Sequence, residues 1–262
     1  FAERSGSVDH IARALGGIGD AAYAAGTLHR AIWAFDRCVE LAEAHGRLAI
    51  IAANRNMRAI ALVFAGPVVG LEAEAEATIA AARRIGHARA EVIACHAAMC
   101  IRIFSGRPAE VFSYFERAQL LSERLGAKRF IAENLAFEGE ALRQIGKLAE
   151  GRAALESALA LSRETGLRYV GPLVIGYLAR ACTDNPARRR ALIEEGTALI
   201  ADDRLAHNVL FFGMNAIDCN LEDGDLDSAR RHTAALAACF HDDPLPFVDF
   251  LVARAEALIL HR

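Results

Sequence analysis

Apolar residues recur along the chain with the spacing of one helix face, in stretches of about 17 residues that end at glycine. The glycines form two interleaved series, each with a period of about 40 residues: Gly26, Gly66, Gly106 and Gly146, and Gly46, Gly86, Gly126 and Gly166. A glycine can close a helix in the left-handed conformation, because it has no Cβ atom to clash. The pattern predicts a helix–turn–helix unit of about 40 residues, repeated along the chain.

Pairs of residues four positions apart recur at the same phase on the second helix of each unit. They are Ala31 and Phe35, Leu71 and Ala75, and Val111 and Phe115, with Leu155 in the fourth unit. Residues at this spacing share one helix face. A hairpin cannot bury such a face alone, so neighbouring hairpins are expected to stack. The first unit has the tetratricopeptide (TPR) signature most clearly, in Ile18-Gly19, Gly26, Ala31, Phe35 and Cys38.

The predicted fold is all-α: a right-handed α–α superhelix, TPR-like, of five to six hairpins that form a single domain over residues 1–262. The units are about 8–46, 47–86, 87–126, 127–166, 167–206 and 207–243, and a capping helix covers 246–260. The later units depart from strict spacing. Asn185-Pro186 stands at the fifth turn, Ala206 replaces a closing glycine, and Gly224 places the sixth turn two residues early. About 13 helices and no sheet are expected.

Composition narrows the class of protein. The 262 residues are 54% apolar with a net charge of -3, which argues against disorder and against nucleic-acid binding. No uncharged apolar run reaches the length of about 18 residues that a membrane-spanning helix needs, so we expect no membrane insertion. The six cysteines have no disulfide or zinc spacing and no signal segment precedes them, which indicates a cytoplasmic protein. The first residue is Phe1 rather than methionine, which suggests a piece of a longer polypeptide.

Several segments resemble a known family. They are residues 17–26, 35–41, 51–55, 85–91 and 244–254. Together they resemble the C-terminal TPR region of bacterial proteins that fuse a class III adenylate/guanylate cyclase domain to an AAA-type ATPase module. The helical-repeat sensor region of large ATP-dependent transcription activators is a second family to which the chain is similar.

The resemblance implies a regulatory or partner-binding module rather than an enzyme. In that family the cyclase and ATPase motifs precede the repeats, and this chain has none of them. Gly146-Lys147 lacks both the earlier glycine and the following hydroxyl residue of a phosphate loop. No catalytic residue is therefore carried over, and no cofactor or metal is expected.

Other polar residues give only weak indications of a metal site or of a binding site. His96 and Cys100 share a helix face, but a metal site needs three or four ligands, so we interpret them as structural. His45, His87 and His207 fall near turns, where imidazole can interact with a helix C-terminus. The run Arg188-Arg189-Arg190 could meet phosphate or an acidic partner. We favour a solvated helix face that Glu194-Glu195 balances.

In TPR arrays the first helix of each unit faces the concave surface. The positions on these helices that the repeat spacing turns inward form a candidate groove. Its residues are Asn56, Met57, Ile60, Phe64, His96, Cys100, Ile103, Phe104, Glu133, Phe137, Glu140, Arg143, Gln144, Tyr177 and Arg180. The groove is predicted to be apolar in the second and third units and charged in the fourth and fifth units. Such a surface suits an amphipathic peptide or partner helix. In the alternative, the apolar half is core or is covered by a neighbouring domain.

Arg55 and Arg58 occupy positions where the repeat usually has large apolar residues. Either the helix is rotated so that both reach solvent, which we prefer, or they form a polar pocket with Asn54. The predicted function is non-catalytic binding of a polypeptide partner or of upstream domains of the same chain. A small-molecule sensor with a pocket between units is the other hypothesis, and no constellation supports an independent enzyme. Exposed end faces would also allow a homodimer.

Overall fold

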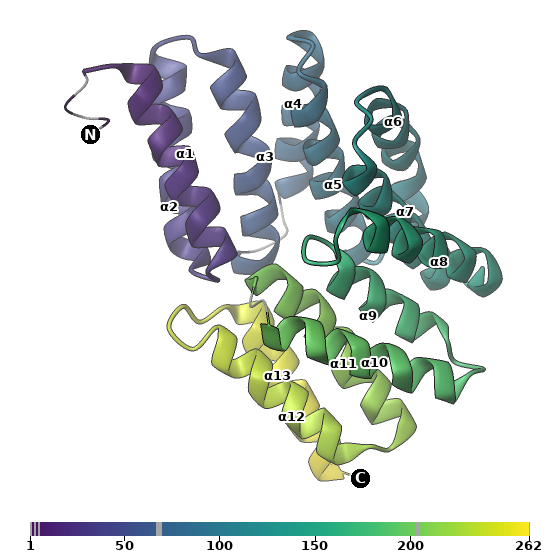
Figure 1. Ribbon diagram of the computed structural model, residues 1–262. Coiled ribbons are helices and arrows are strands. Elements are labelled where there is room, and N and C mark those ends of the chain that lie inside the picture. The colour runs from purple at the N-terminus through teal and green to yellow at the C-terminus, as the bar shows by residue number, and fades with distance from the viewer. Residues whose placement is uncertain (1, 3, 5, 67–69, 203–204, 262) are drawn as a thin grey trace. The chain divides into compact units, whose positions relative to one another are not determined.

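The computed structural model describes residues 2, 4, 6–66, 70–202 and 205–261 (Figure 1). Over these residues the chain forms thirteen α-helices, one 3-10 turn and no strand, as predicted. The helices are α1 (Val8–Ala24), α2 (Leu28–Ala44), α3 (Leu48–Ala65), α4 (Leu71–Arg84), α5 (Ala88–Phe104), α6 (Val111–Arg124), α7 (Lys128–Gln144), α8 (Leu148–Thr165), α9 (Gly171–Ala181), α10 (Pro186–Asp202), α11 (Ala206–Asp223), α12 (Leu226–Cys239) and α13 (Pro246–His261). The 3-10 turn η2 (Pro108–Glu110) precedes α6.

The chain divides into two compact units, Phe1–Gly126 with α1 to α6 and Ala127–Arg262 with α7 to α13. Their boundary coincides with the predicted boundary between the third and fourth hairpins. Each predicted hairpin corresponds to one pair of successive helices. A single continuous solenoid over 1–262 stays a prediction.

Within each unit, consecutive helices pack against each other, and the first helices of neighbouring hairpins also touch. In the first unit, α3 packs on α1 and α5 as well as on α2 and α4. In the second unit, α9 packs on α7 and α11, and α11 packs on α13. Figure 1 shows α1, α2 and α3 running side by side in this way. Neighbouring hairpins therefore stack through two kinds of contact, between a second helix and the next first helix and between successive first helices, and the latter places the first helices in a row within each unit.

The glycine turns form as predicted, with one exception. At Gly26 the backbone adopts a φ of 82°, and the Thr27 N–H reaches back 3.0 Å to the carbonyl oxygen of Ala22 to close α1. Gly66 instead has a φ of -139°, so the prediction of a left-handed glycine at this position is wrong. The residue that follows is Pro67, and a residue before proline is restricted to extended backbone. Gly70, with a φ of 90°, takes the left-handed position before α4.

The TPR signature residues meet in the core as the repeat requires. A Cβ atom at Gly19 would lie 2.5 Å from the Phe35 ring, so only glycine allows this approach of α1 to α2. The same contact recurs three repeats later, where a Cβ at Gly139 would lie 2.6 Å from Leu155. Phe35 and Leu155 are both fully buried. Burial of such a side chain contributes about 1.5–3 kcal/mol, so these contacts are a main source of hairpin stability.

Helix α3 has the length and apolar composition of a membrane span, but it packs against neighbouring helices in the first unit. Its two arginines point outward: Arg55 pairs with Glu43 of α2, and Arg58 pairs with Asp36 of α2 and Glu74 of α4. Asn54 does not join them, because its amide donates to the Ile50 carbonyl oxygen at 2.8 Å. The helix is thus rotated, as preferred, and the arginines tie α3 to its neighbours.

Candidate functional site

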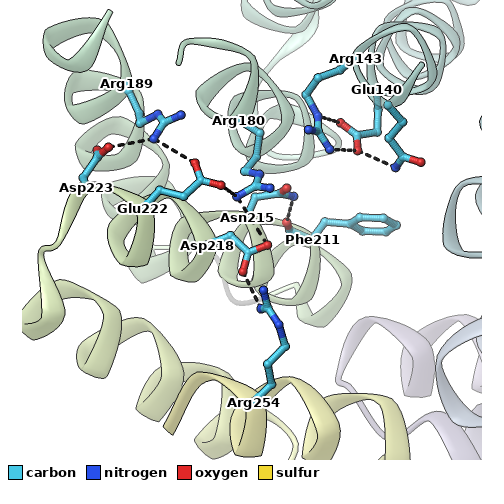
Figure 2. A network of polar contacts seen from close by, with 11 residues as sticks. Glu140, Arg143, Arg180, Arg189, Phe211, Asn215, Asp218, Glu222, Asp223 and Arg254 are labelled. Atoms are coloured by element: carbon cyan, nitrogen blue, oxygen red, sulfur yellow. Dashed lines mark hydrogen bonds and ion pairs between the residues drawn. The ribbon is translucent and has the colours of Figure 1, made fainter. Parts of the chain in front are cut away.

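A row of charged side chains crosses the first helices of the second unit and extends to α10 and α13 (Figure 2). We call Arg180, Arg189, Asp218, Glu222, Asp223 and Arg254 the charged row. Arg180 stands at the end of α9, and the three acidic residues occupy the last two turns of α11. Because α9 and α11 pack side by side, these side chains are brought within ion-pair distance.

Arg180 is the centre of the charged row. Its Nη1 lies 2.7 Å from Glu222 Oε1 and 3.5 Å from Asp218 Oδ2. Asp218 also accepts from Arg254 Nη1 of α13 at 2.7 Å. Positive and negative groups therefore alternate, and each charge has an opposite charge beside it. The side chain of Arg180 is 17% exposed, whereas those of Glu222 and Arg254 are 45% and 41% exposed, so the row remains open to a partner.

Arg189 anchors the other end of the row. Its Nη1 lies 2.8 Å from Asp223 Oδ1 and 3.1 Å from Glu222 Oε2, and its side chain is only 5% exposed. The expectation of a solvated face at 188–190 is therefore wrong for Arg189. Helical periodicity turns this residue inward, and α11, rather than Glu194-Glu195, supplies its counter-charge. The neighbours do lie outside: Arg188 pairs with Glu156, and Arg190 is exposed.

A second charged group lies on α7. Arg143 donates through Nε and Nη2 to the two carboxylate oxygens of Glu140 at 2.8 and 2.7 Å, and Gln144 donates to the same carboxylate. Hydrogen bonding to Glu140 raises the pKa of Arg143 further above its ordinary value, although burial opposes the shift. Glu140 itself is buried. The group is thus a fixed ion pair that presents Arg143 and Gln144 outward.

The predicted apolar half of the groove lies largely inside the protein. Asn56, Phe64, His96, Cys100 and Ile103 are buried. The amide of Asn56 donates to the Ala90 carbonyl oxygen of α5 at 3.1 Å, so it connects two first helices. Met57, Ile60 and Phe104 are partly exposed. The structure thus agrees with the alternative in which most of this half is core.

The aromatic residues of the candidate groove pack edge to face. Phe64 meets Phe104 with ring centroids 5.9 Å apart, and Tyr177 meets Phe211 at 6.2 Å. Tyr177 and Phe137 are buried, while Glu133 is half-buried. Among the predicted groove residues of the second unit, the polar groups that are exposed or half-buried are therefore Glu133, Arg143, Gln144 and Arg180.

Histidines and cysteines form no metal site in the described part of the chain, where no group of three potential ligands occurs. His45 hydrogen-bonds through Nδ1 with the Leu41 carbonyl oxygen at 3.0 Å, at the end of α2 as predicted. His87 differs, because its Nδ1 accepts the Ala90 N–H at 3.2 Å and so caps the start of α5. His207 hydrogen-bonds through Nε2 with the Tyr169 carbonyl oxygen at 3.1 Å.

Asp218, Glu222 and Arg254 were not predicted from the sequence. A signal for Asp218 was present. Glu140 and Arg180 are one repeat apart, and the sixth turn comes two residues early, so the next equivalent position is 218. Applying the same repeat positions to the sixth hairpin would have located Asp218 as the acidic partner of Arg180.

Comparison with known proteins identifies the fold. The crystal structure of the apo form of RapI is similar, with a TM-score of 0.64 over 95% of this chain and 96% of that chain, at 12% sequence identity. No protein-family model matches the chain, and no curated protein matches it. The structural likeness shows that the chain has the α–α superhelical repeat fold, TPR-like, that its sequence predicts.

Proposed function

We propose that this chain is a non-catalytic module that binds a polypeptide along the first helices of its second unit. The observation that carries the proposal is the charged row, in which partly exposed groups from α9, α11 and α13 stand side by side. Repeat proteins of this class use the surface formed by successive repeats for binding.

The chemistry of the row indicates the kind of partner. Arg180 and Arg254 carry guanidinium groups whose remaining N–H donors fit a carboxylate, and Glu222 offers a carboxylate that is almost half exposed. A partner helix or peptide with both acidic and basic side chains satisfies both. When such a partner binds, some ion pairs within the row are replaced by ion pairs with the partner, so the net gain in affinity is small. The alternating charges therefore determine the register in which the partner binds rather than most of its affinity.

We further propose that the partner is a polypeptide region of a cytoplasmic signalling protein, and that this chain is the C-terminal part of a cyclase-type protein. The segments at 17–26 and 244–254 support this proposal through their resemblance. The alternative parent is an ATP-dependent transcription activator with a small-molecule-sensing repeat region. The full reading frame tests both. An upstream cyclase domain followed by a phosphate loop supports the first, and a helix-turn-helix downstream supports the second.

Charge reversal tests the binding surface. In the product of the whole reading frame, Arg180→Glu and Arg254→Glu are expected to reduce cross-linking between the repeats and the preceding region. The control is Arg230→Glu. Arg230 is an exposed arginine of the second helix α12, and among the described residues it forms an ion pair only with Asp227. Circular dichroism of each variant checks that the helices form.

Equal cross-linking in wild type and in both charge-reversal variants, with all of them folded, would overturn the proposed surface. Self-association through an end face remains part of the proposal. Sedimentation of the isolated chain tests it, because a homodimer has twice the monomer mass and dissociates on dilution.

A further inference from the structure

Helix α13 has one face against which no other helix packs in the part of the chain that the structure describes. Its contacts are those of a first helix, because it packs on α12 and on α11, the first helix of the preceding hairpin. In earlier hairpins the second helix covers the first, as where a Cβ atom at Gly139 of α7 would lie 2.6 Å from Leu155 of α8. On α13, the side that points away from α11 and α12 is left open. We call this side the open face.

An apolar stripe runs along the open face. Its members are Phe250, Ala253, Ala257 and Leu260, all of them exposed. Phe250 is 61% exposed and Leu260 is 86% exposed, more than any other large apolar residue that the structure describes. Successive members are three, four and three residues apart, which is the spacing of the a and d positions of a heptad repeat. A helix with this spacing buries its stripe against a second helix.

Charged residues of opposite sign flank the stripe on its two sides. Asp249 and Glu256 take the g positions of the heptad, on one flank, and Arg254 and His261 take the e positions, on the other flank. All four are exposed. Arg254 pairs with Asp218 of α11 at 2.7 Å, and its side chain is still 41% exposed. The open face is thus apolar along its centre, acidic on one edge and basic on the other.

The open face is complementary to a second copy of itself when the two helices run in the same direction. A two-fold axis parallel to the helices sets the acidic flank of one copy against the basic flank of the other. Each g residue then lies near the e residue five positions later in the second copy, so Asp249 meets Arg254 and Glu256 meets His261. In an antiparallel pair, like flanks meet and the charges on both edges repel.

We propose that the open face of α13 is the surface through which this chain self-associates, with two copies packing their α13 helices side by side and parallel. The inference rests on the self-association that belongs to the proposed function, and it specifies where that contact forms. A seam of two heptads is short, so we expect a weak dimer with a Kd on the order of 10 µM. Arg254 belongs to the charged row as well, so substitutions at Phe250 and Ala257 separate the two surfaces best.

Sedimentation equilibrium of the isolated chain, at concentrations around the expected Kd, tests the apolar stripe. The wild-type dimer is expected to dissociate on dilution. Phe250→Glu and Ala257→Glu each place a charge in the seam and are expected to weaken the dimer about tenfold or more. The matched control is Ala234→Glu, the same change at an exposed position of α12, which is expected to alter the Kd less than about twofold. Circular dichroism checks that each variant is helical.

Asp249→Lys tests the direction of the two helices. In the parallel dimer the new lysine faces Arg254 of the second copy, so the dimer is expected to weaken about fivefold. In an antiparallel dimer the same lysine would face the acidic flank, and association would become tighter. A mixture of Asp249→Lys and Arg254→Glu chains restores opposite charges at both contacts, so the heterodimer is expected to form in preference to either homodimer. Native mass spectrometry distinguishes the three species.

Different failures have different meanings. A wild-type chain that stays monomeric would overturn both the self-association and its proposed surface. A dimer that Phe250→Glu and Ala257→Glu leave intact would overturn this surface alone, and tighter association of Asp249→Lys would overturn the parallel orientation. If the isolated chain dimerises but the product of the whole reading frame is monomeric, another segment of the polypeptide covers α13 and a second copy is not its occupant.

Binding at the charged row is tested separately. Phe250→Glu is expected to leave the cross-linking that Arg180→Glu reduces unchanged, because Phe250 contributes no charge to the row. Loss of that cross-linking in folded Phe250→Glu would show that the open face takes part in polypeptide binding, and would contradict its assignment to self-association.

Discussion

Glu91 and Arg117 form a two-point ion pair in which Arg117 Nε and Nη2 lie 2.7 and 3.0 Å from the two carboxylate oxygens of Glu91. The Glu91 side chain is only 3% exposed, and Arg83 Nε donates to it from α4 at 3.0 Å. One carboxylate on α5 therefore connects three helices and two hairpins of the first unit.

Replacing Glu91 by glutamine removes the charge but keeps the volume. We expect Glu91→Gln to lower the free energy of unfolding by about 2 kcal/mol at neutral pH, because hydrogen bonds to charged groups contribute about that much. Urea denaturation followed by circular dichroism measures the change. The control is Glu123→Gln on α6, an exposed carboxylate that accepts only from Gln119 among the contacts described. Its effect is expected to stay below about 0.5 kcal/mol.

The same carboxylate predicts a pH dependence. Burial acts to raise the pKa of Glu91, but hydrogen bonds from Arg117 and Arg83 outweigh it, so the pKa is lowered in the folded protein. A lowered pKa stabilises the fold above the unfolded value of about 4.3, and this stabilisation is lost as the pH falls through the folded value. The stability difference between wild type and Glu91→Gln should therefore shrink in acid. An equal difference at neutral pH and at about pH 3 would show that Glu91 does not act through its charge.

Gly196 is expected to tolerate no larger residue without loss of stability. A methyl group at this position would overlap the buried Phe212 ring, which His232 holds on its other side. Gly196→Ala should therefore destabilise the protein by about 1–3 kcal/mol. Gly213→Ala is the control, because its nearest atoms would lie 3.7 Å away and alanine favours helix. If Gly196→Ala is as stable as Gly213→Ala in thermal unfolding, the packing described here is incorrect.

The reactivity of each cysteine toward an alkylating reagent should decrease with the burial of its thiol. Burial raises the pKa of Cys95 and Cys219 to about 12 and that of Cys38 to about 11, so few of their thiols are ionised at neutral pH. Cys239 is the one cysteine of the six that is not buried. A maleimide added to the native protein is expected to label Cys239 at least about tenfold faster than Cys95 or Cys219, by mass spectrometry of digests. Comparable labelling of all six without denaturant would contradict the burial of the cores.

The repeat pattern predicted the fold because it reports contacts that recur at a fixed spacing. Gly19 with Phe35 and Gly139 with Leu155 are the same contact in different hairpins, and sequence phase finds both. The prediction failed at Gly66 because a local constraint, the proline that follows it, outweighs the repeat. The sequence does contain that proline, so the extended backbone at Gly66 was predictable.

The candidate site was less predictable, because only the pair of Arg180 and Asp218 follows the repeat phase, whereas Arg189 and its partners do not. Arg189 of α10 pairs with Glu222 and Asp223 at the end of α11, which follow it by fewer residues than the repeat of about 40. Charge composition alone could not reveal which arginine is buried. Helical periodicity turns Arg189 inward, where two carboxylates of α11 pair with it, whereas Arg188 is half-buried and Arg190 is exposed.

The charged row should contribute to stability as well as to binding. Arg180→Ala removes the shared partner of Asp218 and Glu222 and leaves their carboxylates close together, so a loss of about 1–2 kcal/mol is expected. Arg163→Ala, which breaks an exposed pair with Glu195, is expected to cost less than about 0.5 kcal/mol. Equal losses in urea denaturation would show that Arg180 acts as an ordinary surface residue.

Site-specific photo-cross-linking tests most directly whether a polypeptide lies against the first helices of the second unit. A benzophenone amino acid is placed at Glu222 in α11, or at Arg230 in α12, within the product of the whole reading frame. Both side chains are exposed, but only Glu222 belongs to the charged row. We predict cross-links from position 222 to the region that precedes the repeats and none from position 230. Equal capture at both positions, or capture at position 230 alone, would contradict the proposed binding surface.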